Sequence, residues 1–407
     1  NTTGTFNNAL GALALSSNTT GSANNAFGYD ALGSNTTGDY NTAVGFALQD
    51  NTTADNNTAV GYSSLLQNTT GGNNAAVGVC ALNANTTGAS NVGIGYLALD
   101  TNTEGSSNTA VGRAALLCNS TGSANTAVGQ EALCLNTAGN NSAFGYHTLK
   151  CNTSGTSNTA IGYSSLLKNT ASNNTAVGYQ SLCANTTGTQ NVAVGTNSLD
   201  TATTGSCNTA LGNGAMGENT TGSNNVAVGR TALFSNTTAS NNTAVGVSAL
   251  QTNTTGGGNA AFGSEALKSN TGSNNTAIGF CSLIANTTAS NNTALGSKSL
   301  DTNTTGASNT AVGYQSLFAN TTGSDNTAVG GEALIANTTG ANNTSIGKNS
   351  MLGNTTGGSN VALGNNALQC NTTANNNTAV GRCSLRSNTT GGGNAAFGSE
   401  ALKSNTG

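Results

Sequence analysis

Few side chains of this chain could do chemistry. Its 407 residues include one His, nine Cys, 14 Asp and Glu and ten Lys and Arg. The single histidine, His147, lies beside Tyr146 at a variable position of a repeat, so no Ser-His-Asp set can recur. Carboxylates such as Asp30 and Glu131 have no recurring carboxylate partner, which paired acid–base catalysis would need. We therefore predict no catalytic residue and no enzyme activity.

Cofactor and metal patterns are also missing from the sequence. The glycine that recurs in every repeat, at the end of N-T-A-V-G, is not part of a G-x-G-x-x-G between a strand and a helix, which is the arrangement of a nucleotide loop. The calcium-binding nonapeptide repeat would need a recurring Asp. The cysteines form no Cys-x-x-Cys pair, which argues against zinc. We predict no cofactor and no metal.

The cysteines leave two interpretations open. Cys118, Cys134 and Cys151 fall in three successive repeats, so a disulfide between neighbouring coils is one interpretation. The other is that cysteine replaces Ser or Ala at small sites. Because the total is odd, at least one thiol is free or paired between chains.

The tripeptide N-T-T, an N-glycosylation acceptor, occurs in most repeats. It is also what a bend and a ladder of asparagines need, so both interpretations stay open. The candidate glycosylation sites are Asn68, Asn185, Asn236, Asn320 and Asn337.

All these residues belong to one repeat of 17 residues, with a few repeats of 16. Residues 309–325, NTAVGYQSLFANTTGSD, are one unit, and we number its positions from Asn309 as position one. Across 24 units, position one is always Asn, position four is Val, Ile, Leu or Phe, and position five is always Gly. Position three is Ala in 22 units, position nine is Leu or Met, and position twelve is Asn in 23 units.

A period of 17 is too short for two-helix repeats and suits one coil of a β-solenoid. N-T-A-V-G predicts a short strand that ends at Gly, A/S-L predicts a second strand, and N-T-T-G predicts a wide bend. The fold class is therefore all-β, a parallel β-solenoid or β-roll of about 24 coils. With about 4.8 Å between coils, the rod would be on the order of 115 Å long.

Stacking must stabilise such coils, because one coil buries little apolar surface. We expect positions four and nine to form core ladders, and the asparagines of positions one and twelve to form polar ladders. The predicted core residues are Val44, Leu48, Val177, Leu182, Val312 and Leu317. The predicted asparagine ladder includes Asn309, Asn320, Asn326 and Asn337.

Both sides of the predicted strands are restricted in residue type, although neighbouring strand residues face opposite ways. We expect the small side, Ala at position three and Ala, Ser or Thr at position eight, to pack against another copy of the chain. The alternative is crowding at tight corners within one chain.

A longer period lies above the 17-residue unit. Residues 253–272 are identical to residues 388–407, which are 135 positions later. We predict one continuous array over residues 1–407, built from three eight-coil blocks, roughly 7–140, 141–274 and 275–407. Because the chain opens on NTTG and closes on SNTG, both fragments of the repeat, we expect it to be a segment of a longer protein.

The amino-acid composition limits the classes of partner that the chain could bind. The net charge is −4, charged residues make up 6%, and the few cations are scattered, so we expect no nucleic-acid partner. No stretch approaches the roughly 18 apolar residues of a membrane span, so we expect no membrane insertion in this segment.

The units resemble two groups of fibrous proteins. N-N-T-A-V-G at residues 56–61 is similar to the Asn-x-x-Ala-Ile-Gly motif of trimeric autotransporter adhesin heads, although those coils are shorter, at about 14 residues. N-T-A-V-G-Y-Q-S-L-x-x-N-T-T-G-S resembles repeats of tail-fibre-like proteins that end in a self-cleaving chaperone domain. The resemblance covers nearly the whole chain. It implies a homotrimer or filament at a cell or virion surface, with surface glycans or a host receptor as partners.

The sequence thus favours a non-enzymatic, structural or adhesive extracellular fibre. The alternative is an ice-binding solenoid, because regular threonine ladders on a flat face can match an ice lattice. Two observations count against that alternative. Position two varies among Thr, Asn, Val, Ala and Ser, and the threonines of N-T-T lie in a predicted bend.

Overall fold

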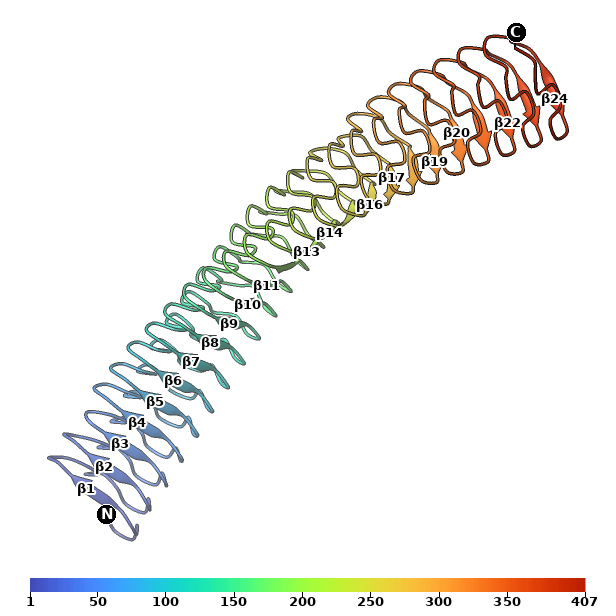
Figure 1. The fold of residues 1–407 in the computed structure, drawn as a ribbon. Coiled ribbons are helices and arrows are strands. Elements are labelled where there is room, and N and C mark those ends of the chain that lie inside the picture. The colour runs from blue at the N-terminus through green and yellow to red at the C-terminus, as the bar shows by residue number, and fades with distance from the viewer. Residues whose placement is uncertain (407) are drawn as a thin grey trace. The chain divides into compact units, whose positions relative to one another are not determined.

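The computed structural model describes residues 1–406, and these residues form strands and turns without any α-helix. None of them therefore belongs to a helix that could cross a membrane. The chain divides into two compact units, Asn1–Thr204 and a second that begins at Gly205. Each unit is a stack of coils that follow one another in chain order (Figure 1).

Each coil contributes one strand of three residues, at positions two to four of the repeat. The strands of the first unit are β1 (Asn8–Leu10), β2 (Asn25–Phe27), β3 (Thr42–Val44), β4 (Thr58–Val60), β5 (Ala75–Val77), β6 (Val92–Ile94), β7 (Thr109–Val111), β8 (Thr126–Val128), β9 (Ser142–Phe144), β10 (Thr159–Ile161), β11 (Thr175–Val177) and β12 (Val192–Val194). Those of the second are β13 (Thr209–Leu211), β14 (Val226–Val228), β15 (Thr243–Val245), β16 (Ala260–Phe262), β17 (Thr276–Ile278), β18 (Thr293–Leu295), β19 (Thr310–Val312), β20 (Thr327–Val329), β21 (Thr344–Ile346), β22 (Val361–Leu363), β23 (Thr378–Val380) and β24 (Ala395–Phe397).

Within each unit, every strand pairs in parallel with the strand of the next coil, and equivalent positions lie opposite each other. In β19 and β20, for example, Thr310, Ala311 and Val312 pair with Thr327, Ala328 and Val329. The predicted fold class, an all-β parallel β-solenoid with coils of 16 or 17 residues, is confirmed. Because paired strands are about 4.8 Å apart, the twelve coils of each unit stack over roughly 50 Å.

The predicted second strand around A/S-L is wrong, because positions six to eleven form consecutive turns. In nearly every coil the residues at positions seven and nine have left-handed backbone angles, such as φ 54° at Gln315 and φ 50° at Leu317. Leu rarely adopts this conformation, so its sequence gives no sign of it. Coil-to-coil hydrogen bonds hold it in place: Leu317 N–H donates to Ala333 O at 3.0 Å, and Gln315 N–H donates to Ser297 O at 3.2 Å.

The glycine at position five closes the strand, and its conformation explains why it never varies. Gly313 has φ 134°, which L side chains rarely adopt. A Cβ on this residue would lie 2.6 Å from the carbonyl oxygen of Gly330 in the next coil. Any side chain here would force neighbouring coils apart.

The core consists of Leu and small residues. Leu48, Leu182 and Leu317, all at position nine, are fully buried. So are the alanines of position three in the coils between the two end coils, including Ala311. The small side of the strand is therefore covered by its own coil, and the expectation that another copy covers it is wrong.

The valines predicted for the core face outward instead. Val44 is exposed, and Val177 and Val312 are half-buried. Because Ala311 points into the coil, its neighbours at positions two and four must point out. The interior of the coil is narrow enough that Ala at position three and Leu at position nine fill it.

The continuous array over residues 1–407 and its three eight-coil blocks stay predictions. In each unit, the 16-residue coils keep the strand register of their neighbours. Thr42 to Val44, in a 16-residue coil, pairs in register with Thr58 to Val60.

Candidate functional surface

The asparagines of position one form a ladder inside each unit. The Oδ1 atom of Asn309 accepts a hydrogen bond at 3.0 Å from the backbone N–H of Asn326, in the next coil. The Nδ2 atom of Asn309 donates to the carbonyl oxygen of Gly323 at 2.8 Å. Both residues are fully buried. Each asparagine thus joins two coils and also satisfies a carbonyl of the wide bend.

The asparagines of position twelve form a second ladder. Asn337 Nδ2 donates to Asn320 Oδ1 at 2.8 Å, and Asn320 Nδ2 donates to Asn303 Oδ1 at 2.8 Å. Asn320 Nδ2 also donates to Gly323 O at 2.9 Å, the same oxygen that accepts from Asn309. The two ladders therefore meet at one carbonyl in a coil that has Asn at both positions, and this explains why both positions are Asn in nearly every unit.

The five candidate glycosylation sites lie in this second ladder, and all five are fully buried. Asn68 is typical: its Nδ2 donates to Asn51 Oδ1 and to Gly71 O, each at 2.9 Å. A glycan on this nitrogen would replace a ladder donor and would need space inside the coil. The packing therefore argues against glycans at Asn68, Asn185, Asn236, Asn320 and Asn337.

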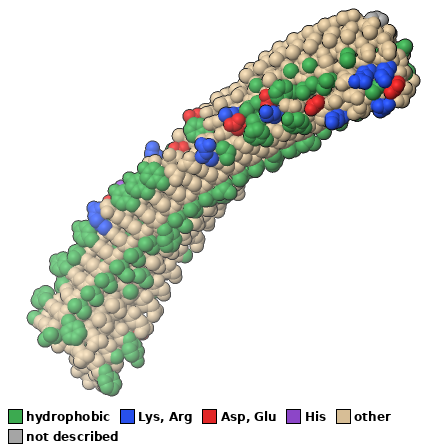
Figure 2. Space-filling model, viewed as in Figure 1, with side chains coloured by type: hydrophobic (Ala, Val, Ile, Leu, Met, Phe, Trp, Pro, Cys, Tyr) green, Lys and Arg blue, Asp and Glu red, His purple; other side chains and the backbone are tan. Residues whose placement is uncertain are grey.

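The outer side of the strands carries a row of large apolar side chains, which we call the outer-face ladder. It consists of the position-four residues of all coils, and their exposed fraction is often close to 40%, as at Ile94 (42%) and Leu295 (43%). Figure 2 shows exposed hydrophobic side chains in rows along each stack of coils. The members of the outer-face ladder that are exposed in the interior coils are Phe27, Val44, Val77, Ile94, Phe144, Ile161, Leu211, Phe262, Ile278, Leu295 and Ile346.

Position two faces outward beside this ladder. In five consecutive coils of the second unit this residue is threonine, and equivalent residues are paired from strand to strand. These are Thr276, Thr293, Thr310, Thr327 and Thr344. No repeat carries a charged residue at position two or four. The outer face of the strands is therefore uncharged over both units.

The turn beside the strand holds the aromatic and charged side chains of positions six, seven and ten. Tyr146, Tyr163 and Tyr179 stack on one another, with ring centroids 5.3 and 5.2 Å apart and interplanar angles of 13° and 12°. The spacing follows from the distance between coils.

One charged cluster in this flank lies in the first unit, around Glu131. Lys150 Nζ lies 2.6 Å from Glu131 Oε2, His147 Nε2 lies 3.0 Å from the same oxygen, and Arg113 Nη1 lies 2.9 Å from Oε1. The hydrogen bond from Lys150 is the main reason that the pKa of Glu131 falls to about 2. The same bond raises the pKa of Lys150. His147 is thus one of the side chains that contact Glu131, a position that sequence reasoning did not assign to it.

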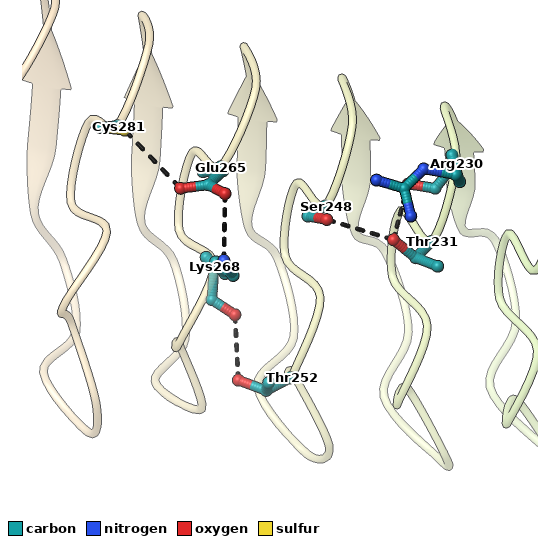
Figure 3. A network of polar contacts seen from close by, with 7 residues as sticks. All are labelled: Arg230, Thr231, Ser248, Thr252, Glu265, Lys268 and Cys281. Atoms are coloured by element: carbon teal, nitrogen blue, oxygen red, sulfur yellow. Dashed lines mark hydrogen bonds and ion pairs between the residues drawn. The ribbon is translucent and has the colours of Figure 1, made fainter.

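A second polar network, shown in Figure 3, lies in the second unit. Lys268 Nζ donates to Glu265 Oε1 at 3.0 Å, and the Cys281 thiol donates to Glu265 Oε2 at 3.8 Å. Thr252 Oγ1 donates to the carbonyl oxygen of Lys268 at 2.9 Å, which links the next coil. Burial raises the pKa of the Cys281 thiol. These contacts connect successive coils.

Within residues 1–406, no pocket is found and no group of three or more His, Cys, Asp or Glu residues could hold a metal ion. The features that recur along both units are the two asparagine ladders, interrupted at Ala202 in the second ladder, the apolar core and the outer-face ladder. Of these, only the outer-face ladder is accessible to another molecule.

No family model matches the chain, and no curated protein matches its sequence. The function must therefore be argued from the geometry of the repeat.

Sequence reasoning missed the outer-face ladder because it placed the larger apolar residue of each strand inside. The signal that could have found it is the variation at position four. Val, Ile, Leu and Phe alternate there over a wide range of volumes, whereas position three is almost always Ala. A tightly packed interior rarely tolerates such changes in volume.

Proposed function

We propose that this chain is a non-enzymatic structural rod that associates with further copies of itself through the outer-face ladder, forming an extracellular fibre. The observation that carries the proposal is an apolar, uncharged strip that is repeated in every coil. Monomeric proteins rarely expose continuous apolar surface on this scale.

A rough magnitude supports association over many coils and argues against association through one. Burying a whole Val, Leu, Ile or Phe side chain contributes about 1.5–3 kcal/mol, so covering an exposed fraction near 40% contributes roughly 0.6–1.2 kcal/mol. Association costs about 4–15 kcal/mol in lost freedom. One coil cannot offset this cost, but about a dozen coils can.

A second copy of this chain fits the surface better than an unrelated partner. The ladder has the same coil-to-coil spacing in every copy, so two copies can match coil by coil along their length. No charge needs to be desolvated in the contact, because positions two and four carry none. A trimer or a filament would satisfy this arrangement. Adhesion to a surface glycan or host receptor would fall to the variable positions six, seven and ten, which lie beside the ladder.

The test places lysines on the outer-face ladder and compares them with matched lysines elsewhere. The test variant is Ile278→Lys, Leu295→Lys and Val312→Lys. The control is Thr288→Lys, Thr305→Lys and Thr322→Lys, at exposed bend positions of the same three coils. We expect sedimentation to show a shift toward the monomer for the test variant only, with circular dichroism unchanged. Equal association of both variants would overturn the proposed surface.

The second candidate is ice binding, and one observation favours it, although position two varies elsewhere in the chain. The threonines of position two lie on the paired strands and not in a bend, and five of them are consecutive from Thr276 to Thr344. A thermal-hysteresis measurement decides: activity that is lost in a Thr293→Tyr, Thr310→Tyr variant would support it. Zero activity in the unmodified protein would remove it.

A further inference from the structure

Three cysteines lie in neighbouring coils of the first unit. Cys118 precedes β8 (Thr126–Val128), Cys134 follows it, and Cys151 follows β9 (Ser142–Phe144). Cys134 is buried, whereas Cys118 and Cys151 are half-buried, and none of the three is in a disulfide. They stand at positions eleven, ten and eleven of their repeats.

The backbone brings Cys118 and Cys134 together. The N–H of Cys118 donates to the carbonyl oxygen of Cys134 at 2.9 Å. Directly hydrogen-bonded neighbouring chains run about 4.8 Å apart, and a disulfide needs Cα atoms about 4.4–6.8 Å apart. The hydrogen bond therefore places the two backbones next to each other, one position out of register, within the range of separations that a disulfide can span.

Cys151 is placed less directly. Its N–H donates to Leu167 O in the following coil at 3.1 Å. At this place the coils of Cys134 and Cys151 are joined by a backbone hydrogen bond from Leu135 N–H to Lys150 O at 3.0 Å. Neither cysteine takes part in that hydrogen bond. Of the two neighbours, Cys118 is the one bonded to Cys134 itself.

The side chains are also close in electrostatic terms. Burial is the main reason that the pKa of Cys134 rises to about 11, and a negative charge on Cys118 is the next cause. Glu131 and Cys151 raise it further, and Lys150 lowers it. Among the neighbouring thiols, Cys118 thus has the stronger influence.

We propose that Cys118 and Cys134 form a redox-dependent disulfide that crosslinks two neighbouring coils. The inference is independent of self-association through the outer-face ladder.

The reaction balances with a low-molecular-weight disulfide such as oxidised glutathione. The half-buried Cys118 thiolate attacks one sulfur, a mixed disulfide forms, and a glutathione thiolate leaves and takes a proton. Cys134 then loses its proton and attacks the Cys118 sulfur, which releases the second glutathione. Two protein thiols are oxidised and one glutathione disulfide is reduced to two thiols.

The closing step carries a pH signature. The attacking group is the thiolate of Cys134, and its raised pKa leaves little thiolate at neutral pH. The rate of closure should therefore rise about tenfold per pH unit between pH 7 and 9.

Tryptic digestion separates the two pairings cleanly. Cleavage after Arg113, Lys150 and Lys168 gives peptide 114–150, which contains both Cys118 and Cys134, and peptide 151–168, which contains Cys151. After incubation of the folded protein with oxidised glutathione at pH 9, remaining thiols are alkylated under denaturing conditions. We expect peptide 114–150 to be two hydrogens lighter and unalkylated, and peptide 151–168 to carry one alkyl group.

Variants complete the test. Cys118→Ser should abolish the bridge, whereas Cys151→Ser and the exposed Cys370→Ser should leave it intact. Amide exchange in residues 118–134 should slow by up to about 100-fold on oxidation, the effect expected for closing a loop of this length. Full alkylation of peptide 114–150, or a link between peptides 114–150 and 151–168, would overturn the proposal.

Discussion

The two faces of strand β19 (Thr310–Val312) follow different rules. Ala311 is fully buried and has an Ala counterpart in most coils, whereas Val312 lies outside and has Val, Ile, Leu and Phe counterparts. The inner face has to fit a coil whose far wall carries Leu317, also fully buried. The outer face has no such wall. The inner face therefore fixes side-chain volume, while the outer face fixes only apolar character.

The residues that stabilise the folded coil are therefore different from the residues that the coil exposes to its surroundings. Ala, Leu and the two asparagine ladders account for folding. The apolar character of the outer face supports strand pairing within one chain, and the self-association proposed above would cover the part of this face that stays exposed.

The largest predicted loss of stability comes from removing a large side chain from the interior of the coil. Leu317→Ala should lower the free energy of unfolding by about 2–5 kcal/mol, because it leaves a cavity in a fully buried site. Val312→Ala, five residues away on the outer face, should cost less than about 1 kcal/mol in the dissociated chain, because this half-buried side chain leaves no enclosed cavity. Denaturant titration of both variants checks the comparison, and equal losses would contradict it.

A larger side chain on the inner face gives a second test of the difference between the two faces. Ala311→Val should cost about 1–3 kcal/mol, because the extra methyl groups have no space. Val329→Ile, which adds one methylene on the outer face of the next coil, is the control and should change the free energy of unfolding by less than about 0.5 kcal/mol. If Ala311→Val were as well tolerated as the control, the coil interior would not be filled.

The asparagine ladder gives a third test. Asn320→Ala removes the acceptor of Asn337 Nδ2 and one of the two donors to Gly323 O. Leaving buried polar groups without partners should cost about 1–3 kcal/mol. Thr322→Ala, at an exposed site of the same bend, is the control and should be within about 0.5 kcal/mol of the unmodified chain. A loss confined to the control would refute the ladder.

The smallest predicted effect on stability is electrostatic and comes from the charged cluster around Glu131. The pKa of Glu131 is lowered from 4.5 to about 2, so its stabilising contribution is complete above about pH 4.5 and is lost as the pH falls toward 2. Glu131→Gln should therefore destabilise the chain by less than about 1 kcal/mol at pH 7. Against the unmodified chain, the difference should disappear near pH 2. A difference that is the same at both pH values would show that the ion pairs contribute nothing.

Much of the fold could be predicted from the sequence, because positions that never vary among the 24 units mark residues that the structure requires. Gly313 and Asn309 never vary among units, and each has one structural reason, a backbone angle for the first and a ladder bond for the second. The period and the parallel stacking follow from these invariant positions.

Two features could not be predicted, for identifiable reasons. Alternation along a strand says that Ala311 and Val312 face opposite ways, but it does not say which one faces inward. A larger apolar residue is usually the core residue, and here the narrow coil reverses that preference. The left-handed turn at Leu317 was missed because Leu has no tendency to adopt that conformation, and only coil-to-coil hydrogen bonds hold it.

The account rests on the claim that the outer-face ladder is covered by other copies of this chain. The most direct measurement is the mass of the unmodified protein in solution, by light scattering over a range of concentrations. The account predicts a mass that is a multiple of the 39.6 kDa chain, or a filament. A mass of one chain at every concentration, with the coils folded, would contradict it.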